Sequence, residues 1–346
     1  GLTLTNGTTY YISVRATDNV GNVSTVATAD GITIDTDNPV LTTPIEGSFA
    51  IDADYQNIAD TLVISWSGSD TASGIAMYEY ALDFTFSGIS MSLIPWTSAD
   101  TATADTLTGL SLLTEGATYY LSVRATDVAG NISDPDTSDG ITIDLTAPAG
   151  TTVSDGTGAD ISYSGSDTTL SANWVAFTET VSGVQKYEYA IGTTSGGTEV
   201  ATWTDNDTAT SVTKSGLTLS NGTEYYISVR ATDNAENVST TIISDGVMID
   251  TAAPTAGNVT DSTAADLDWT RSTSSLTSTW TGFSDALSGI QKYEYAIGDT
   301  IGGTNVLSWT NNSTITSVTK TGLTLTNGTT YYISVRATDN VGNVST

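Results

Sequence analysis

The stretch GLTLTNGTTYYISVRATDNVGNVST, residues 1–25, dominates the sequence because close copies of it begin at Gly109, Gly216 and Gly322. The copies lie about 107 residues apart, and a fixed period indicates repeated structural units. This period is much longer than a solenoid repeat, but it matches a whole β-sandwich of roughly 100 residues. The sequence therefore predicts an all-β chain of β-sandwich domains arranged end to end.

Apolar and polar side chains alternate along this stretch. Tyr10, Ile12 and Val14 fall on one face of an extended strand, and Ser13 and Arg15 fall on the other. A period of two is typical of a strand with one buried face, so we expect the apolar set to face the core.

A turn follows each of these strands. The segment DNVGN begins at Asp18, and its glycine, Gly21, is suited to a positive φ. In the third copy Glu236 replaces this glycine. That turn must therefore use another geometry or carry strain of about 1 kcal/mol or more.

Two further phrases recur with the same period and divide the chain. One begins at Ser73, Ser182 and Ser288, and the other ends at Pro39, Pro148 and Pro254. We predict the last two strands of a sandwich in residues 1–37, whole sandwiches in 38–144 and 145–250, and a sandwich lacking its final strand in 251–346. Because residues 1–25 and 322–346 are identical, we expect a window from a longer array. The alternative is that the incomplete ends complete each other by strand exchange between subunits.

The composition excludes several classes of function. The chain has no cysteine and no histidine, which rules out disulfides, nucleophile–imidazole catalysis and a typical zinc site. Its 9 basic and 39 acidic residues give a formal net charge of -30, which disfavours nucleic acid and anionic membranes as partners. No apolar run approaches the ~20 residues of a membrane helix. We expect no catalytic residues, because paired carboxylates that recur in every repeat indicate architecture.

A leucine six residues before a tyrosine opens each copy of the recurring stretch. The pairs are Leu4/Tyr10, Leu113/Tyr119, Leu219/Tyr225 and Leu325/Tyr331, and Trp66, Trp174 and Trp280 precede the later three. This pattern resembles fibronectin type III domains and the related bacterial immunoglobulin-like repeats of large surface or filament proteins. The resemblance covers essentially the whole chain. It implies that the tyrosine hydroxyl bonds back to the nearby backbone and that the tryptophan lies on an early core strand.

Three acidic positions recur in register and are the main site candidates. The first ends a domain, the second lies four residues before the glycine of the phrase that begins at Ser73, and the third opens the last hairpin. The sets are Asp35, Asp70 and Asp127; Asp144, Glu179 and Asp233; and Asp250, Asp285 and Asp339. In a fibronectin-like topology the three would converge at one pole, where a Ca²⁺ ion could neutralise them, with Asn131, Asn237 and Asn343 as further ligands. The alternative is that each acid caps its own turn.

Other motifs have plainer interpretations. Trp96, Trp203 and Trp309 recur after the middle strand, and packing over the sandwich edge is favoured over stacking on sugar rings. Asp52-Ala53-Asp54 and Asp134-Pro135-Asp136 begin like calcium loops but lack the later glycine and acid. We expect both to be solvated loops.

These features predict the structural repeat region of a long extracellular protein of bacterial type. It would be a surface stalk or fibre that projects or connects, with calcium stiffening the domain junctions. Its partners would be neighbouring repeats of the same chain, and copies of itself if it forms a filament. Two alternatives remain open: a carbohydrate- or protein-binding adhesin module, and an array of accessory domains of a secreted hydrolase.

Overall fold

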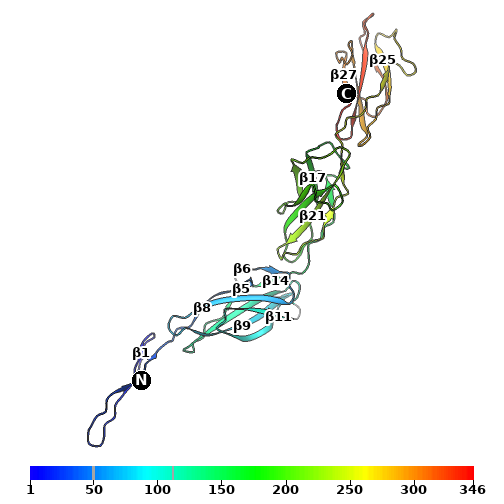
Figure 1. Cartoon of the computed structure of the whole chain (residues 1–346). Helices are drawn as coiled ribbons and strands as arrows, with labels where there is room; N and C mark the ends of the chain where they lie inside the picture. The colour runs from blue at the N-terminus through cyan, green and yellow to red at the C-terminus, as the bar shows by residue number, and fades with distance from the viewer. Residues whose placement is uncertain (49–50, 111–112) are drawn as a thin grey trace. The chain divides into compact units, whose positions relative to one another are not determined.

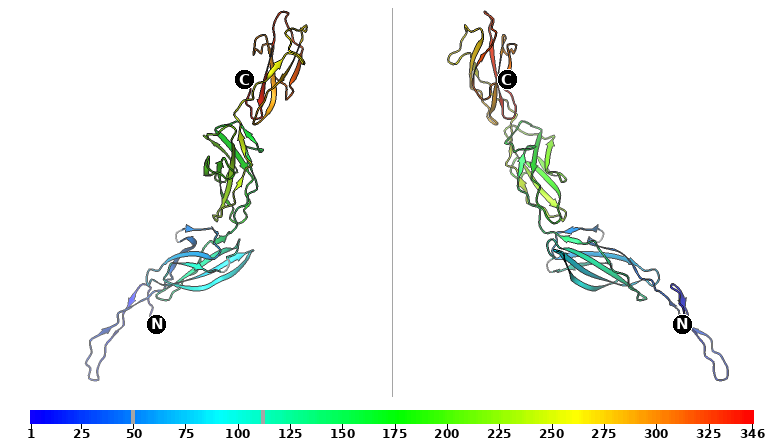
Figure 2. Two further views of the ribbon diagram at one scale, coloured as in Figure 1. Left: turned by 45° about the vertical axis from the view of Figure 1, so that its right-hand side comes forward. Right: turned by 180° about the vertical axis from the view of Figure 1, so that it is seen from behind.

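The computed structural model describes residues 1–48, 51–110 and 113–346, in which strands are the only regular elements (Figures 1 and 2). The described chain is therefore all-β, as predicted. It forms two compact units. The first comprises residues 1–148, 179–184 and 232–238, and the second comprises 149–178, 185–231 and 239–346. No helix long and apolar enough to cross a membrane occurs in the described residues.

The amino-terminal piece of the first unit is a hairpin of short strands. Strand β1 (Thr9–Tyr10) pairs with β4 (Ile32–Thr33), and β2 (Ser13–Val14) pairs with β3 (Ala27–Thr28). Ile12 and Val14 are 68% and 62% exposed, so the prediction of a buried face is wrong for this copy. The reason is that no second sheet covers this hairpin among the described residues.

Residues 40–143 of the first unit form two sheets. One has the order β11 (Ala104–Thr108), β8 (Thr61–Ser69), β5 (Val40–Ser48) and β6 (Ile51–Asp52). The other has the order β10 (Ile89–Asp100), β9 (Ile75–Phe86), β12 (Thr118–Asp127), β14 (Ile141–Ile143) and β7 (Tyr55–Gln56), and β13 (Asp136–Thr137) also pairs with β12. The pairs are antiparallel except β14 with β7, which is parallel. Figure 1 labels strands of both sheets.

Side chains from both sheets form the core of this sandwich. Leu62 and Ile64 of β8 and Leu121 and Val123 of β12 are fully buried in one cluster. Along β12 buried residues alternate with partly exposed ones, so the predicted period of two is confirmed for this copy. Trp66 is 5% exposed in the same cluster, as predicted for the core tryptophan.

The second and third repeats share the order of six strands, and the second has three more, β16 (Tyr163–Ser164), β22 (Ile242–Ile243) and β23 (Val247–Ile249). The second has β15 (Val153–Asp155), β17 (Thr169–Trp174) and β20 (Ser211–Ser215) in one sheet, and β16, β23, β21 (Glu224–Asp233), β18 (Val184–Gly192) and β19 (Ala201–Asp205) in the other, with β22 on β21. The third has β24 (Asn258–Thr260), β25 (Ser275–Thr281) and β28 (Ser317–Thr321), and β27 (Leu307–Asn311), β26 (Ile290–Gly298) and β29 (Tyr332–Asp339). The predicted domain boundaries at 37/38, 144/145 and 250/251 stay predictions.

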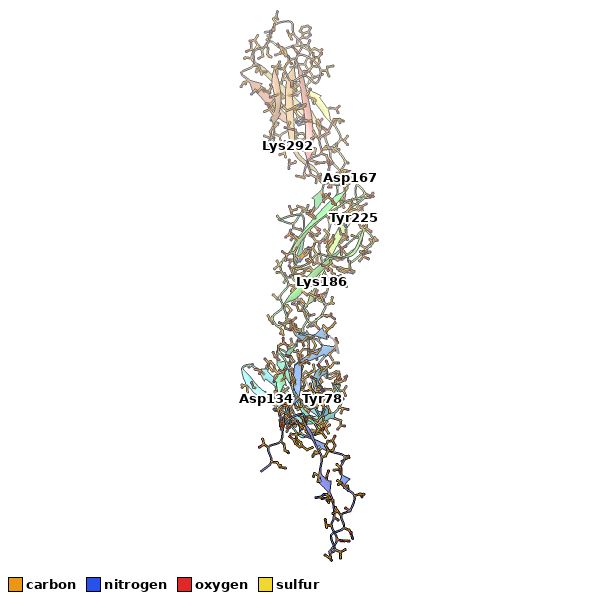
Figure 3. The ribbon with its side chains drawn as sticks, turned by 90° about the vertical axis from the view of Figure 1, so that its left-hand side faces the viewer. Tyr78, Asp134, Asp167, Lys186, Tyr225 and Lys292 are labelled. Atoms are coloured by element: carbon orange, nitrogen blue, oxygen red, sulfur yellow. The ribbon has the colours of Figure 1, made fainter. Side chains whose placement is uncertain are left out.

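The tyrosine of the recurring stretch bonds back to the backbone in every copy. The hydroxyl oxygens of Tyr10, Tyr119, Tyr225 and Tyr331 accept hydrogen bonds at 2.9–3.0 Å from the backbone N–H five residues earlier. Tyr225 is labelled in Figure 3. This contact fixes the turn before the strand, as the resemblance implied.

Candidate functional site

The acid that opens the last hairpin caps its own turn in each repeat. Asp127 Oδ1 accepts hydrogen bonds from the backbone N–H groups of Gly130 at 2.6 Å and Asn131 at 2.8 Å. Its Oδ2 accepts a further bond from Asn131 Nδ2 at 2.8 Å. Asp233 and Asp339 receive the same kinds of bond from their own turns. These carboxylates organise the turn as an Asx cap does.

The asparagine of each turn reaches the segment that enters the repeat. Asn131 Nδ2 donates to the carbonyl oxygen of Asp35 at 3.2 Å, and Asn237 and Asn343 make the same bond to Asp144 and Asp250. The amide nitrogen is thus engaged with two oxygens. These contacts tie the last hairpin to the incoming chain, and a role of the asparagines as further cation ligands stays a prediction.

The second acid caps the loop before the middle strand. Asp70 Oδ1 accepts hydrogen bonds from the N–H groups of Ser73 at 2.8 Å and Gly74 at 2.7 Å. The bond from Gly74 is the largest influence on Asp70, and its pKa lies below the ordinary value. Asp285 accepts the equivalent bond from Gly289 at 2.8 Å, and Glu179 accepts one from Gly183.

The first acid of each set lies on the segment that enters the repeat. Asp144 and Asp250 are fully buried, and their Oδ2 atoms accept hydrogen bonds from Ser182 N at 3.1 Å and Ser288 N at 3.0 Å. Asp35 is only partly buried, although its Oδ2 is enclosed and has no hydrogen-bond partner. The same sequence position therefore differs in burial among the repeats.

The three acids meet in two of the three predicted sets. Each residue of the Asp35, Asp70, Asp127 set offers an oxygen within 4.8 Å of the others, and so does each residue of the Asp250, Asp285, Asp339 set. Asp144, Glu179 and Asp233 do not form such a group among the described residues. Here Glu179 bends back on its own loop, accepting hydrogen bonds from Thr180, Val181 and Gly183. Burial, followed by the nearby charge of Asp144, raises the pKa of Asp233.

The turn-capping alternative is thus directly visible in the hydrogen bonds. Backbone N–H groups partly balance the charge of the acids that meet in the two complete sets. Calcium binding at these positions stays a prediction.

The second recurring tryptophan lies beneath an arginine. The guanidinium carbon of Arg124 is 4.5 Å from the centre of the Trp96 ring, and its Nε is 2.7 Å from Glu79 Oε2. The same contact forms in the other repeats, between Arg230 and Trp203 and between Arg336 and Trp309. In both, the guanidinium carbon is 4.3 Å from the centre of the ring. The arginine occupies one ring face, a cation–π contact that favours packing over sugar stacking. Sequence reasoning missed this role, although arginine recurs at the same position of every copy.

Comparison with known proteins gave relatives named as an exoglucanase and a chitinase. The chain is 32% identical over 257 residues to Exoglucanase B of Cellulomonas fimi, and the match covers 73% of this chain and 21% of the relative. It is 30% identical over 199 residues to Chitinase A1 of Niallia circulans, and the match covers 57% of this chain and 24% of the relative. The chain therefore spans less than a quarter of the length of these curated relatives. No family profile matches it.

Solved structures of similar architecture include the fibronectin(III)-like modules of Clostridium thermocellum CbhA. They are 12% identical with a TM-score of 0.35, and the match covers 61% of this chain and 94% of that one. The strand order, the tyrosine corner and the buried core tryptophan are repeated within this chain itself. The chain is a tandem array of fibronectin type III-like β-sandwich domains with immunoglobulin-like architecture.

Proposed function

We propose that this array is the non-catalytic accessory part of a longer, secreted, polysaccharide-degrading protein. It would act as a spacer between functional domains outside this sequence. The match to Exoglucanase B carries the proposal, because it covers 73% of this chain but only 21% of the enzyme. The chain thus resembles a part of such an enzyme. An extracellular location follows from the same relationship.

The chemistry of the described surface supports a non-catalytic role. An open depression of the first sandwich is lined by Thr42, Thr43, Ile45, Ser65, Trp66, Ser67, Thr103 and Ala104. None of these side chains is a general acid or base. The acids of the two complete junction sets recur from repeat to repeat, and the acid that opens the last hairpin in each accepts hydrogen bonds from its own turn. Glycoside hydrolysis uses a single pair of carboxylates on either side of a bound sugar.

A spacer must hold its domains in line, which scattering from the chain in solution can test. Strand β12 has 10 residues, so each sandwich is roughly 35 Å long at about 3.3 Å per residue. Three in line predict a radius of gyration of roughly 30 Å. A compact chain of this length would give about 20 Å. A value near 20 Å would contradict the spacer role.

Activity and binding assays on the same chain complete the test. We expect no release of soluble sugar from cellulose or chitin and no co-sedimentation with either polymer. Co-sedimentation with either polymer would instead support the carbohydrate-binding alternative if Trp203→Ala abolished it and Trp269→Ala did not. Trp269 is 88% exposed and serves as the control. Sugar release by the purified chain would overturn the non-catalytic assignment.

The original expectation of a surface stalk or filament stays a prediction. It shares the repeated sandwich with the accessory array, but the enzyme relatives favour the latter. Calcium stiffening of the junctions is a separate proposal with its own measurement. Chelation should lower the radius of gyration if ions hold the junctions straight, and an unchanged value would contradict stiffening.

A further inference from the structure

We call the turns that Asp127, Asp233 and Asp339 cap the junction turns. A second kind of acidic cluster lies away from them, at the place where the first strand of a sandwich approaches the loop before its last strand. In the first sandwich it comprises Glu46, Asp52 and Asp139, and in the second Asp155, Asp160 and Asp245. In each trio, one oxygen of every residue lies within 4.8 Å of the others. We name these trios the edge clusters.

The edge clusters occupy the same places in both repeats. Their first member, on β5 or β15, precedes a glycine, and the second follows it five or six residues later. The third belongs to a Ser-Asp-Gly sequence just before β14 or β23. The second member accepts the backbone N–H of the first, from Glu46 to Asp52 Oδ1 at 3.2 Å and from Asp155 to Asp160 Oδ1 at 2.7 Å. The arrangement is therefore a repeated feature of the fold.

The first member of each edge cluster is completely buried and only half satisfied. Glu46 and Asp155 are both 0% exposed. Glu46 Oε1 accepts hydrogen bonds from Leu121 N at 3.0 Å and from the Ser138 hydroxyl, and Asp155 Oδ2 accepts one from Gly246 N at 3.2 Å. The other oxygens, Glu46 Oε2 and Asp155 Oδ1, are buried without any hydrogen-bond partner. A buried polar atom in this state calls for an explanation.

No basic side chain balances these charges. None of the ion pairs among the described residues includes a member of either edge cluster. Burial raises the pKa of Glu46 to about 7 and that of Asp155 to about 6, and the neighbouring aspartates add to both shifts. Each buried carboxylate needs either a proton or a cation, because it has no basic partner and an unpaired buried charge is costly.

We propose that each edge cluster binds a Ca²⁺ ion, with the unpartnered oxygen of Glu46 or Asp155 as its buried ligand. The ligands are carboxylate oxygens only, which suits a hard cation and disfavours zinc. The other two members of each cluster are exposed, so water can complete the six to eight ligands that calcium takes. The ion would join the first strand of the sandwich to the loop before its last strand.

The third repeat shows that the local loop forms without the buried site. Asp261 N donates to Asp266 Oδ1 at 3.0 Å, the same contact as in the first two repeats. Asp261 is nevertheless exposed, and no described acid completes a trio with this pair. In the two repeats with a buried first member, the Ser-Asp-Gly segment supplies hydrogen bonds to it, from Ser138 and from Gly246.

The test is a calcium titration of the complete chain after removal of metal with a chelator. Isothermal titration calorimetry and thermal unfolding would compare wild type with a Glu46→Gln/Asp155→Asn double variant. We expect the double variant to lose two equivalents of bound calcium and most of the calcium-dependent rise in melting temperature. In chelator it should melt at or above the wild-type temperature, because the neutral amides remove the unpaired buried charges.

Further variants separate the edge clusters from the junction turns. Asp139→Asn/Asp245→Asn changes only exposed members, so it serves if the buried substitutions prevent folding, and it should weaken calcium binding at least tenfold. The control Asp70→Asn/Asp285→Asn alters junction acids and should leave the two edge equivalents unchanged. Wild type that binds no calcium, or edge variants that bind as much as wild type, would overturn the proposal. Equal affinity for Mg²⁺ would overturn the choice of calcium.

Discussion

The junction turns and the edge clusters both gather acids, but they satisfy them differently. At a junction turn Asp127 accepts three hydrogen bonds from residues no more than four positions away. At an edge cluster Glu46 accepts its bonds from Leu121 and Ser138, 75 and 92 residues away, and one of its oxygens has no partner. Proximity of carboxylates is common to both, so proximity does not distinguish a structural cap from a ligand site.

The number of satisfied oxygen atoms does distinguish Asp127 from Glu46. A carboxylate that accepts several backbone N–H bonds is stabilised in its charged form. A carboxylate that is buried with a free oxygen favours a proton or a metal ion. We therefore expect opposite consequences when the charge is removed: loss of stability at a junction turn and gain at an edge cluster in the absence of calcium.

Removing a junction carboxylate should have the largest effect. Asp127→Ala eliminates the acceptor of three hydrogen bonds at a site that is 2% exposed. Bonds to a charged acceptor are strong, so we expect the free energy of unfolding of the first sandwich to fall by about 3 to 4 kcal/mol. Urea denaturation followed by tryptophan fluorescence would measure the loss.

The matched control for this variant is Asp134→Ala in the same hairpin (Figure 3). Asp134 is exposed, so its replacement should change the free energy by less than about 0.5 kcal/mol. Equal effects of the two substitutions would show that the junction carboxylate does not organise the turn.

The edge carboxylate Glu46 should make stability depend on pH when calcium is absent. Its pKa is raised from 4.5 to about 7, mainly by burial, with Asp52 and Asp139 adding to the shift. Between these values the folded chain retains a proton that the unfolded chain releases. Stability is therefore full below about pH 4.5 and is lost as pH rises through about 7. The loss between pH 5 and pH 8 should be about 2 to 3 kcal/mol.

Urea denaturation in chelator at pH 5, 6, 7 and 8 would measure this dependence for wild type and Glu46→Gln. The difference between the two isolates Glu46, because the other acids titrate in both proteins. The wild type should lose stability relative to the variant as pH rises. If the free energies of unfolding of the two proteins changed in parallel with pH, the burial of Glu46 would not disfavour its charged form. The contrast with the junction turns would then be lost.

The sequence predicted the features that depend on neighbours along the chain. The alternation around Tyr119 follows from the period of two, and the resemblance to fibronectin type III domains implies the tyrosine corner and the core tryptophans. The structure contains each of them. The acids of the junction turns were also found, because they recur in register. The failure of the middle set to gather depends on how the longer Glu179 side chain folds onto its loop, which the residue type alone does not determine.

The edge clusters could not be predicted in the same way. Glu46 looks like an ordinary polar residue near a turn, and its burial depends on strands far along the chain. Asp52 was expected in a solvated loop, and its side chain is indeed exposed. What the sequence does not show is that Glu46, close to Asp52, is fully buried. The signal available was the recurrence of an acid-glycine pair at Glu46 and Asp155.

The smallest expected effect concerns the backbone of the junction turns themselves. Glu236 has a φ of 69°, in the left-handed region, where the equivalent Gly130 and Gly342 have φ values of 96° and 100°. The strain predicted from the sequence is therefore present. Because glycine adopts this conformation without steric cost, Glu236→Gly should raise the free energy of unfolding of the second sandwich by about 1 kcal/mol. Gly130→Ala, the reverse change in the first sandwich, should lower it by about the same amount. Chemical denaturation of both variants beside wild type would measure these changes, and a destabilised Glu236→Gly would mean that the side chain of Glu236 contributes more than its backbone strain costs.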